Sequence, residues 1–240
     1  MANDALARLA QRPRPTTVGG VIARLEVIEE DVPATGGVAA FNRLYRWTTE
    51  QVAAGVEGGR FEDPQGMADL DVVFANLYFD AVDAWAHGRQ PPGAWRPLFE
   101  RSDDPGIPML QFALAGMHAH INRDLAVALA TSSPGHLRED SPQFRDFEAI
   151  NTVLDQTSDQ IRDRILPPAL VAADHALGEV DDRLVMAAIM TARRAAWEVA
   201  RRLHEVAGVA PMYIAALEIL DTSVGATARA ILDPAGVLGA

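Results

Sequence analysis

The chain contains no cysteine and no lysine among its 240 residues. The lack of cysteine excludes disulfides, thiolate nucleophiles and thiolate zinc sites, so any metal would need His, Asp or Glu ligands. The lack of lysine excludes Schiff-base catalysis and the lysine of a nucleotide-binding P-loop. All 21 basic residues are arginine, a pattern that favours GC-rich coding bias over a functional meaning.

Positive charge is also scarce, because 33 acidic residues give the chain a net charge of −12. Nucleic-acid binding needs clustered positive charge, so this balance disfavours a nucleic-acid partner. No uncharged apolar run is long enough to span a bilayer, and the first 14 residues lack a secretory pattern. We therefore expect a cytoplasmic protein without a membrane partner.

Several cofactor motifs are missing. The sequence has no Gly-x-Gly-x-x-Gly, no P-loop, no Gly-x-Ser-x-Gly and no His-Glu-x-x-His. These absences predict no nicotinamide, flavin or nucleotide cofactor. They leave either no cofactor or a single divalent metal.

What is present is abundant apolar sequence, 49% of all residues, with apolar positions recurring at spacings of three and four. This periodicity predicts an all-α single domain of about seven helices packed around a buried central helix. Residues 1–16 are expected to form a flexible lead-in, 17–233 the domain and 234–240 a tail. The helices are expected at 17–30, 38–56, 64–87, 109–130, 142–166, 180–206 and 211–232. The five prolines between residues 90 and 108 predict a loop that packs down as a strap or lid.

The most informative feature is the polar segment His118-Ala-His-Ile-Asn-Arg-Asp124 within the apolar run 109–130. A helix that is apolar all round is buried, and buried polar groups need partners. At helical spacing His118 pairs with Asn122 and His120 with Asp124, on faces about 200° apart, with Arg123 between them. The second pair suits either a histidine oriented by a carboxylate for proton transfer or two ligands of a metal.

A second polar stripe lies on the helix predicted at 64–87, where Asn76, Asp80, Asp83 and His87 follow one another at helical spacing. The stripe is either a solvent face or the opposing wall of a site. If the two helices pack antiparallel, Asp80 and Asp83 would face a histidine pair. His120, Asp124 and Asp80 would then be candidate metal ligands. A buried structural network, with Arg123 paired to Asp80 or Asp83, is the competing interpretation.

Other residues are candidates for binding a substrate. Tyr45, Tyr78 and Trp47 are aromatic side chains that either line a pocket or fill the core, and Trp197 is a further candidate for substrate contact. Arg193 and Arg194, close to Trp197 in sequence, either belong to a solvated helix face that forms exposed ion pairs or include an anion-binding residue.

The chain resembles a bacterial domain family of unknown function, numbered 5995, over roughly residues 17 to 205. The resemblance rests on the segments Phe41-Asn-Arg-Leu-Tyr45, Asp71-Val-Val-Phe-Ala-Asn-Leu-Tyr-Phe-Asp80, Trp95-Arg-Pro-Leu-Phe99, Gln111 to Leu125 and Ala195-Ala-Trp197. His120, Asn122 and Asp124 match the family pattern, whereas an Asn usually stands at position 118, Arg123 is often His and His87 does not belong to it. The resemblance implies no established reaction. It directs attention to Asp80, His120, Asn122 and Asp124.

These features lead to three hypotheses of function. The first is a small-molecule enzyme in which His120, Asp124, Asp80, Asn122 and His118 carry acid–base or metal-assisted chemistry. Hydrolysis (a hydrolase), or dehydration or cyclisation (a lyase), is then expected, and secondary metabolism is a plausible setting. Asn76, Tyr78, Asp83, Arg123, Trp197 and Tyr45 would contact the substrate. The second is a non-catalytic protein that binds an apolar small molecule, and the third is a structural module, with a homodimer as an open alternative.

Overall fold

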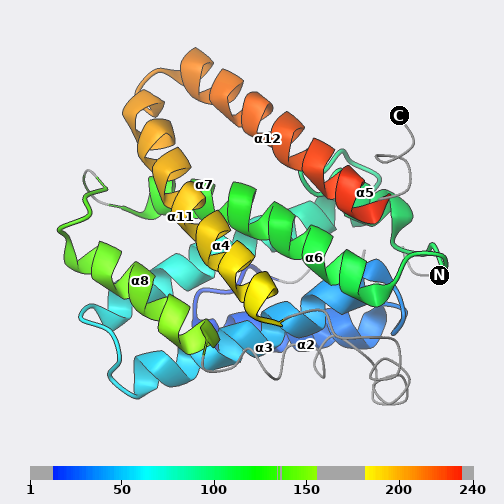
Figure 1. Cartoon of the computed structure of the whole chain (residues 1–240), viewed down its shortest axis with the longest axis horizontal. Helices are drawn as coiled ribbons and strands as arrows, with labels where there is room; N and C mark the ends of the chain where they lie inside the picture. Colours follow the sequence, from blue (N-terminus) through cyan, green and yellow to red (C-terminus); the bar gives the residue numbers. More distant parts are fainter. Residues whose placement is uncertain (1–12, 134, 136, 156–181, 234–240) are drawn as a thin grey trace.

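The computed structural model describes residues 13–133, 135, 137–155 and 182–233, and they form an all-α domain (Figure 1). The all-α prediction is therefore confirmed. The expected N-terminal lead-in up to residue 12, the tail from 234 and the predicted helical stretch 156–166 lie outside the described residues.

The first three helices are α2 (Val18–Asp31), α3 (Gly37–Glu57) and α4 (Pro64–Ala86), close to their predicted bounds. Side chains that precede two of them satisfy free backbone N–H groups of the first turn. Thr17 accepts a hydrogen bond from the Gly20 N–H at 3.1 Å, and Asp63 accepts one from the Gly66 N–H at 2.9 Å. Thr and Asp are common N-cap residues for this reason.

The predicted central helix is one continuous rod with an irregular middle. It consists of α6 (Met109–Ala119), the π-helix η1 (His120–Leu125) and α7 (Ala126–Ser132). The π-helical turn was not predicted. It coincides with the polar segment, and such turns occur frequently at functional sites.

The remaining long helices surround this rod. They are α8 (Pro142–Asp155), α11 (Asp182–Val206) and α12 (Ala210–Leu232). α3 and α12 pack against α6, and α4 and α11 pack against α7. In Figure 1, α12 lies above the central rod while α2 and α3 lie below it. The rod is therefore enclosed by helices, as its apolar sequence predicts.

The proline-rich segment contains a short helix, α5 (Arg96–Arg101), where the sequence predicted only a loop. Its apolar side chains are fully packed: Trp95 is 0% exposed, and Leu98 and Phe99 are also buried. The segment is thus a strap fixed to the core, and Pro97 occupies the first helical turn, where proline is tolerated.

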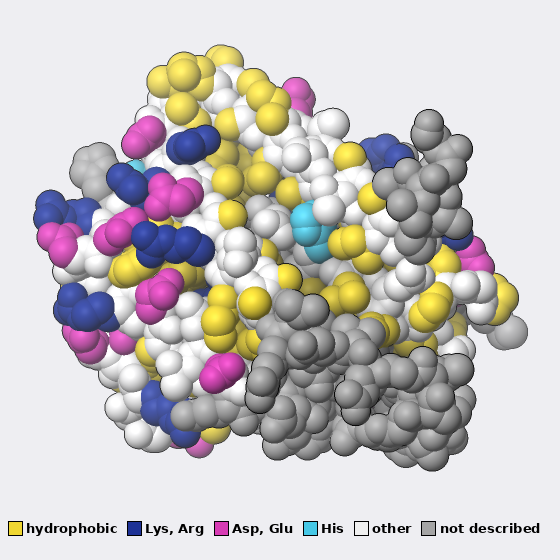
Figure 2. All heavy atoms as spheres, in the orientation of Figure 1, with side chains coloured by type: hydrophobic (Ala, Val, Ile, Leu, Met, Phe, Trp, Pro, Cys, Tyr) yellow, Lys and Arg dark blue, Asp and Glu magenta, His cyan; other side chains and the backbone are white. Residues whose placement is uncertain are grey.

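Hydrophobic side chains remain exposed mainly at the start of α12. Figure 2 shows them gathered at the upper edge of the molecule. The large exposed ones are Val209, Met212, Ile214 and Ile219. Within the described ranges, no helix has the length and hydrophobicity needed to cross a bilayer.

Gly116 on α6 lies directly against the ring of Phe41 on α3. A Cβ at this position would lie 2.5 Å from Phe41 Cγ, well inside van der Waals contact. We predict that Gly116→Ala lowers the free energy of unfolding by about 1–3 kcal/mol, because the clash outweighs the helix propensity of alanine. Urea denaturation followed by circular dichroism measures this change.

Gly19→Ala is the matched control, because a Cβ at Gly19 in α2 meets no atom within 4 Å. It should leave stability unchanged or raise it by about 0.5–1 kcal/mol. Equal effects of the two substitutions would contradict tight packing between α3 and α6.

Candidate functional site

The site is organised around the buried carboxylate of Asp124, which is 0% exposed. Its Oδ2 lies 3.0 Å from His120 Nδ1 and accepts a hydrogen bond from Trp95 Nε1 at 2.9 Å. Its Oδ1 accepts a hydrogen bond from Arg123 at 2.8 Å. An ionised carboxylate only accepts, so Nδ1 of His120 carries the proton and Nε2 keeps a free lone pair.

The imidazole of His120 is enclosed by aromatic rings. Phe74 stacks on it face to face, with ring centroids 3.6 Å apart and planes 9° apart. Tyr45 lies edge-on at 4.3 Å. The rings of Phe41, Tyr78 and Trp95 complete the enclosure at 5.5 to 6.1 Å.

Burial among these rings lowers the pKa of His120, and the hydrogen bond and charge of Asp124 oppose this shift without cancelling it. The imidazole is therefore neutral at neutral pH. Its Nε2 is buried and has no hydrogen-bond partner among the described residues. A buried acceptor without a partner is costly, so this atom is poised to accept a hydrogen bond or a proton.

His120 forms part of the wall of a cavity of about 100 Å³. The wall is built from side chains of α3, α4, α8, α11 and the central helix. Most of them are apolar, for example Leu44, Val52, Phe74, Met117, Leu125 and Ile189. The polar exceptions are His120, Tyr45, Thr48, Thr49, Asp71 and Arg193. An apolar cavity with a few polar groups is the usual form of a small-molecule site.

Asp71 of α4 is the second titratable group of this wall. It is 8% exposed, and its Oδ2 has no hydrogen-bond partner within the described part of the chain. Burial raises the pKa of Asp71 to about 7. Burial and then the charge of Asp71 raise the pKa of Tyr45, and the neighbouring hydroxyl of Thr49 opposes the shift.

The predicted aromatic residues have different positions. Tyr45 lines the cavity. Tyr78 is fully buried beside it, with its hydroxyl 3.5 Å from Asn42 Oδ1. Trp197 belongs to the core, where it packs against Phe144 and Phe147.

The other histidine pair faces away from His120, as the helical spacing predicts. Asn122 donates to the His118 backbone carbonyl at 3.0 Å and lies 3.1 Å from its ring Nδ1. Burial lowers the pKa of His118, and the backbone carbonyl of Val224 on α12 opposes the shift. Neither residue lines the cavity.

Arg123 does not pair with Asp80 or Asp83, so the proposed partners of the buried network were wrong. It binds Asp124, and its Nε lies 3.3 Å from Asp221 Oδ1 on α12. Asp221 also accepts a hydrogen bond from the Ala94 N–H at 3.3 Å. Arg123 thus links the central helix to α12 and the strap.

The polar stripe of α4 does not face the cavity. Asp80 is 45% exposed and forms an ion pair with Arg14. Asp83 binds Arg89 and lies 3.3 Å from His87 Nδ1.

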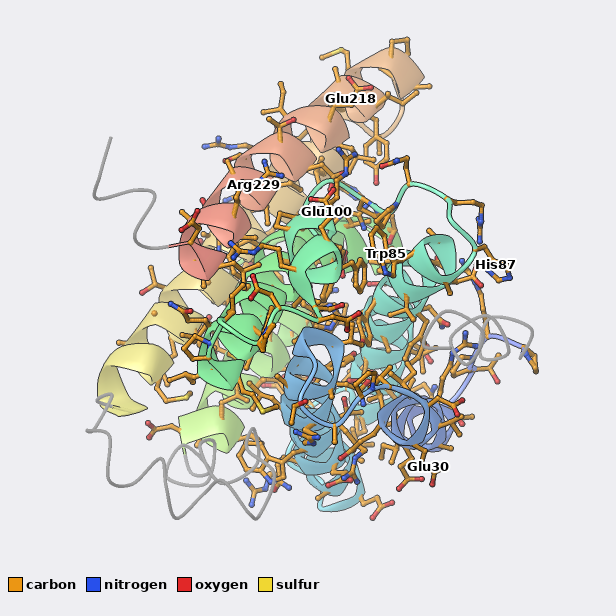
Figure 3. All side chains as sticks on the ribbon, turned by 90° about the vertical axis from the view of Figure 1, so that its right-hand side faces the viewer. Glu30, Trp85, His87, Glu100, Glu218 and Arg229 are labelled. Atoms are coloured by element: carbon orange, nitrogen blue, oxygen red, sulfur yellow. The ribbon has the colours of Figure 1, made fainter. Side chains whose placement is uncertain are left out.

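Asn76 and His87, the other two residues of the stripe, lie on the same side of α4 as Asp80 and Asp83. Asn76 donates to the backbone carbonyls of Pro15 and Val72 at 3.0 and 2.9 Å. His87 follows the last turn of α4 at the periphery of the molecule (Figure 3). The stripe is the outer face of the helix, one of the two alternatives left open by the sequence.

The proposed metal ligands His120, Asp124 and Asp80 therefore do not form a common set. Asp80 lies with Arg14, and the described contacts of Asp124 already engage both of its oxygens. Within the described ranges, no three His, Asp or Glu side chains are grouped so as to hold a metal ion.

The strap also differs from the expected lid. No residue between 90 and 108 lines the cavity described above. The strap contributes to the site through Trp95, whose Nε1 donates a hydrogen bond to Asp124.

Sequence reasoning missed Asp71 as a functional candidate, although helical spacing contained the signal. Met67, Leu70, Phe74 and Tyr78 recur at spacings of three and four, and Asp71 lies on the same face. Asp80 lies about 180° away from it at 100° per residue. A single acidic residue on an apolar helical face is the pattern that indicates Asp71.

The family comparison agrees with the resemblance seen in the sequence. The model of a family of unknown function (DUF5995) matches residues 18–234, so the chain belongs to this family. No curated protein and no solved structure matches the chain.

The pKa of Asp71 predicts how stability depends on pH. Its folded-state value of about 7 lies above the ordinary value of 3.8, so the folded protein loses stability as pH rises between these values. Asp71→Asn removes this loss. At pH 8 the variant should be more stable than the wild type by up to about 4 kcal/mol, and at pH 4 the two should be similar.

Denaturation at both pH values measures the difference. Asp80→Asn is the control on the outer face of α4, where an exposed ion pair contributes less than about 1 kcal/mol. If the wild type were the more stable protein and its margin over Asp71→Asn grew with pH, the burial of an acid without a cationic partner would be contradicted.

Proposed function

We propose that this member of the DUF5995 family is an enzyme that binds a small, largely apolar molecule at His120 and catalyses proton transfer on it. The observation that carries the proposal is the free Nε2 of a neutral, buried imidazole in the wall of an apolar cavity. Asp124 holds the other ring nitrogen and so fixes the tautomer. A base oriented by a carboxylate is a recurrent arrangement in catalysis.

In this mechanism His120 Nε2 is the general base. It takes a proton from a carbon atom or a water molecule in the cavity, and the imidazolium that forms is stabilised by the adjacent charge of Asp124. A positioned base of this kind contributes about 10²- to 10⁴-fold to a rate. The surrounding rings lower the local dielectric constant, which strengthens the electrostatic effect of Asp124.

Asp71 supplies the complementary acid. With a pKa of about 7, about half of its carboxyl groups are protonated at neutral pH. Two titratable groups whose pKa values are displaced by their surroundings suit paired acid and base roles.

This pair favours dehydration among the expected reactions. His120 takes the proton of a C–H bond, and those electrons form a C=C bond. The neighbouring C–O bond breaks, and its oxygen takes the Asp71 proton and leaves as water. Transfer of the proton from His120 to Asp71 through water restores both groups, and the step needs no further cofactor.

Non-catalytic binding of an apolar ligand is the second candidate, favoured by the predominance of apolar side chains in the cavity wall. In that case His120 and Asp71 would only orient the ligand. A ligand that copurifies equally with the wild type and with His120→Gln, without any base-dependent reaction, would support it.

A probe reaction tests the base without knowledge of the natural substrate. A nitrobenzisoxazole opens when a base removes its ring C–H proton, the N–O bond breaks and a coloured nitrophenolate appears. We predict that the wild type accelerates this reaction and that His120→Gln lowers the rate about 100-fold. The wild-type rate should rise with pH through a pKa below 6.5, because burial lowers the pKa of His120.

His118→Gln is the matched control, since His118 lies two residues away but outside the cavity, and it should retain the wild-type rate. Circular dichroism checks that both variants are folded. A wild-type rate no higher than that of the buffer, or equal losses in the two variants, would overturn the proposal.

A further inference from the structure

Arg193 of α11 is a buried cation in the wall of the same cavity. It is 7% exposed, and its guanidinium carbon lies 4.4 Å from the centre of the Phe147 ring. Nε donates to Asn151 Oδ1 at 2.8 Å, and Nη2 donates to the Phe147 backbone carbonyl at 2.7 Å. Both acceptors are neutral, so these bonds position the guanidinium without neutralising its charge.

No carboxylate of the described residues forms an ion pair with Arg193. Burial lowers the pKa of Arg193, and the negative charge of Glu148 opposes this shift. Glu148 itself accepts a hydrogen bond at Oε2 from Asn151 at 3.4 Å. Burial alone raises the pKa of Asp71, the acidic residue of the cavity wall. Among the described residues, the positive charge of the cavity wall therefore has no ion-pair partner, although the charge of Glu148 acts on it without direct contact.

The remaining nitrogen of the guanidinium is available. Nη1 donates to none of the described residues, whereas Nε and Nη2 are both engaged. A buried charge without a partner is strongly destabilising, and a guanidinium is suited to bind carboxylates. The free N–H groups of Nη1 are thus the natural anchor for an anionic ligand.

We propose that the cavity binds a monocarboxylate with an apolar body, and that Arg193 anchors its carboxylate through Nη1. This proposal rests on the proposed function only in placing the apolar body of the substrate beside His120. A single guanidinium, with no other cation among the described residues of the wall, favours one negative charge over a phosphate dianion. Arg193 is thereby a binding residue, separate from the base.

The test compares two small probes of equal length, hexanoate and hexanamide, at neutral pH. Isothermal titration calorimetry measures their binding to the full-length protein. We expect hexanoate to bind the wild type about 10- to 100-fold more tightly than hexanamide, as one charge-assisted hydrogen bond would provide. Hexanoate should also compete with the nitrobenzisoxazole probe.

Arg193→Gln should remove the preference for hexanoate. Arg194→Gln is the matched control, because Arg194 is adjacent, exposed and bound to Glu139, and it should retain the preference. Arg193→Lys keeps the charge and should retain part of the preference. If Arg193→Gln does not fold, the comparison of probes on the wild type and on Arg193→Lys still decides the proposal.

Three outcomes would overturn it: equal affinity of the wild type for the two probes, an unchanged preference in folded Arg193→Gln, or no binding of hexanoate at about 10 mM. His120→Gln separates the two proposals. Hexanoate selectivity without any His120-dependent reaction would support the anion site and reject catalysis. A His120-dependent reaction without hexanoate selectivity would do the reverse.

Discussion

The arrangement of the domain depends on one buried carboxylate. Asp124 has no exposed surface, and an ionised carboxylate in such a position is tolerated only with several donors. Its donors are Trp95 of the strap and His120 and Arg123 of the π-helical turn. Arg123 in turn reaches Asp221 on α12. A single negative charge thus ties the strap, the central helix and α12 together, and the same contact fixes the tautomer of the imidazole.

The overall fold could be predicted because its signals are local. Caps at Thr17 and Asp63 and the three–four apolar spacing are sufficient to place the helices. The short helix at Arg96–Arg101 was not predicted, because five nearby prolines indicate a loop and the sequence does not show the burial of Leu98 and Phe99 that accompanies the helical turn. The π-helical turn was also missed, because apolar spacing predicts a helix without distinguishing a π-turn from an α-helix.

Half of the candidate site was predictable for the same reason. The pair His120–Asp124 is local, four residues apart on one helix, so spacing alone identifies it. The second partner of Arg123, Asp221, lies 98 positions away, and no pattern within one helix indicates that contact. On α4 the sequence offered two acidic positions on opposite faces, Asp71 and Asp80, and the regular stripe drew attention to the outer one. Which face of an apolar helix is buried depends on the neighbouring helices.

The cavity wall contains two groups, Asp71 and Arg193, whose burial does not stabilise the protein. Burial raises the pKa of Asp71 to about 7, and Arg193 keeps its charge beside neutral acceptors. Pairing these two residues directly would satisfy both, yet no ion pair joins them in the described structure. Binding and catalytic sites commonly carry such a cost in stability, which a ligand repays when it binds. A ligand with a carboxylate at Arg193 and a reacting carbon beside His120 would compensate for the unpaired groups while leaving Asp71 free to donate its proton.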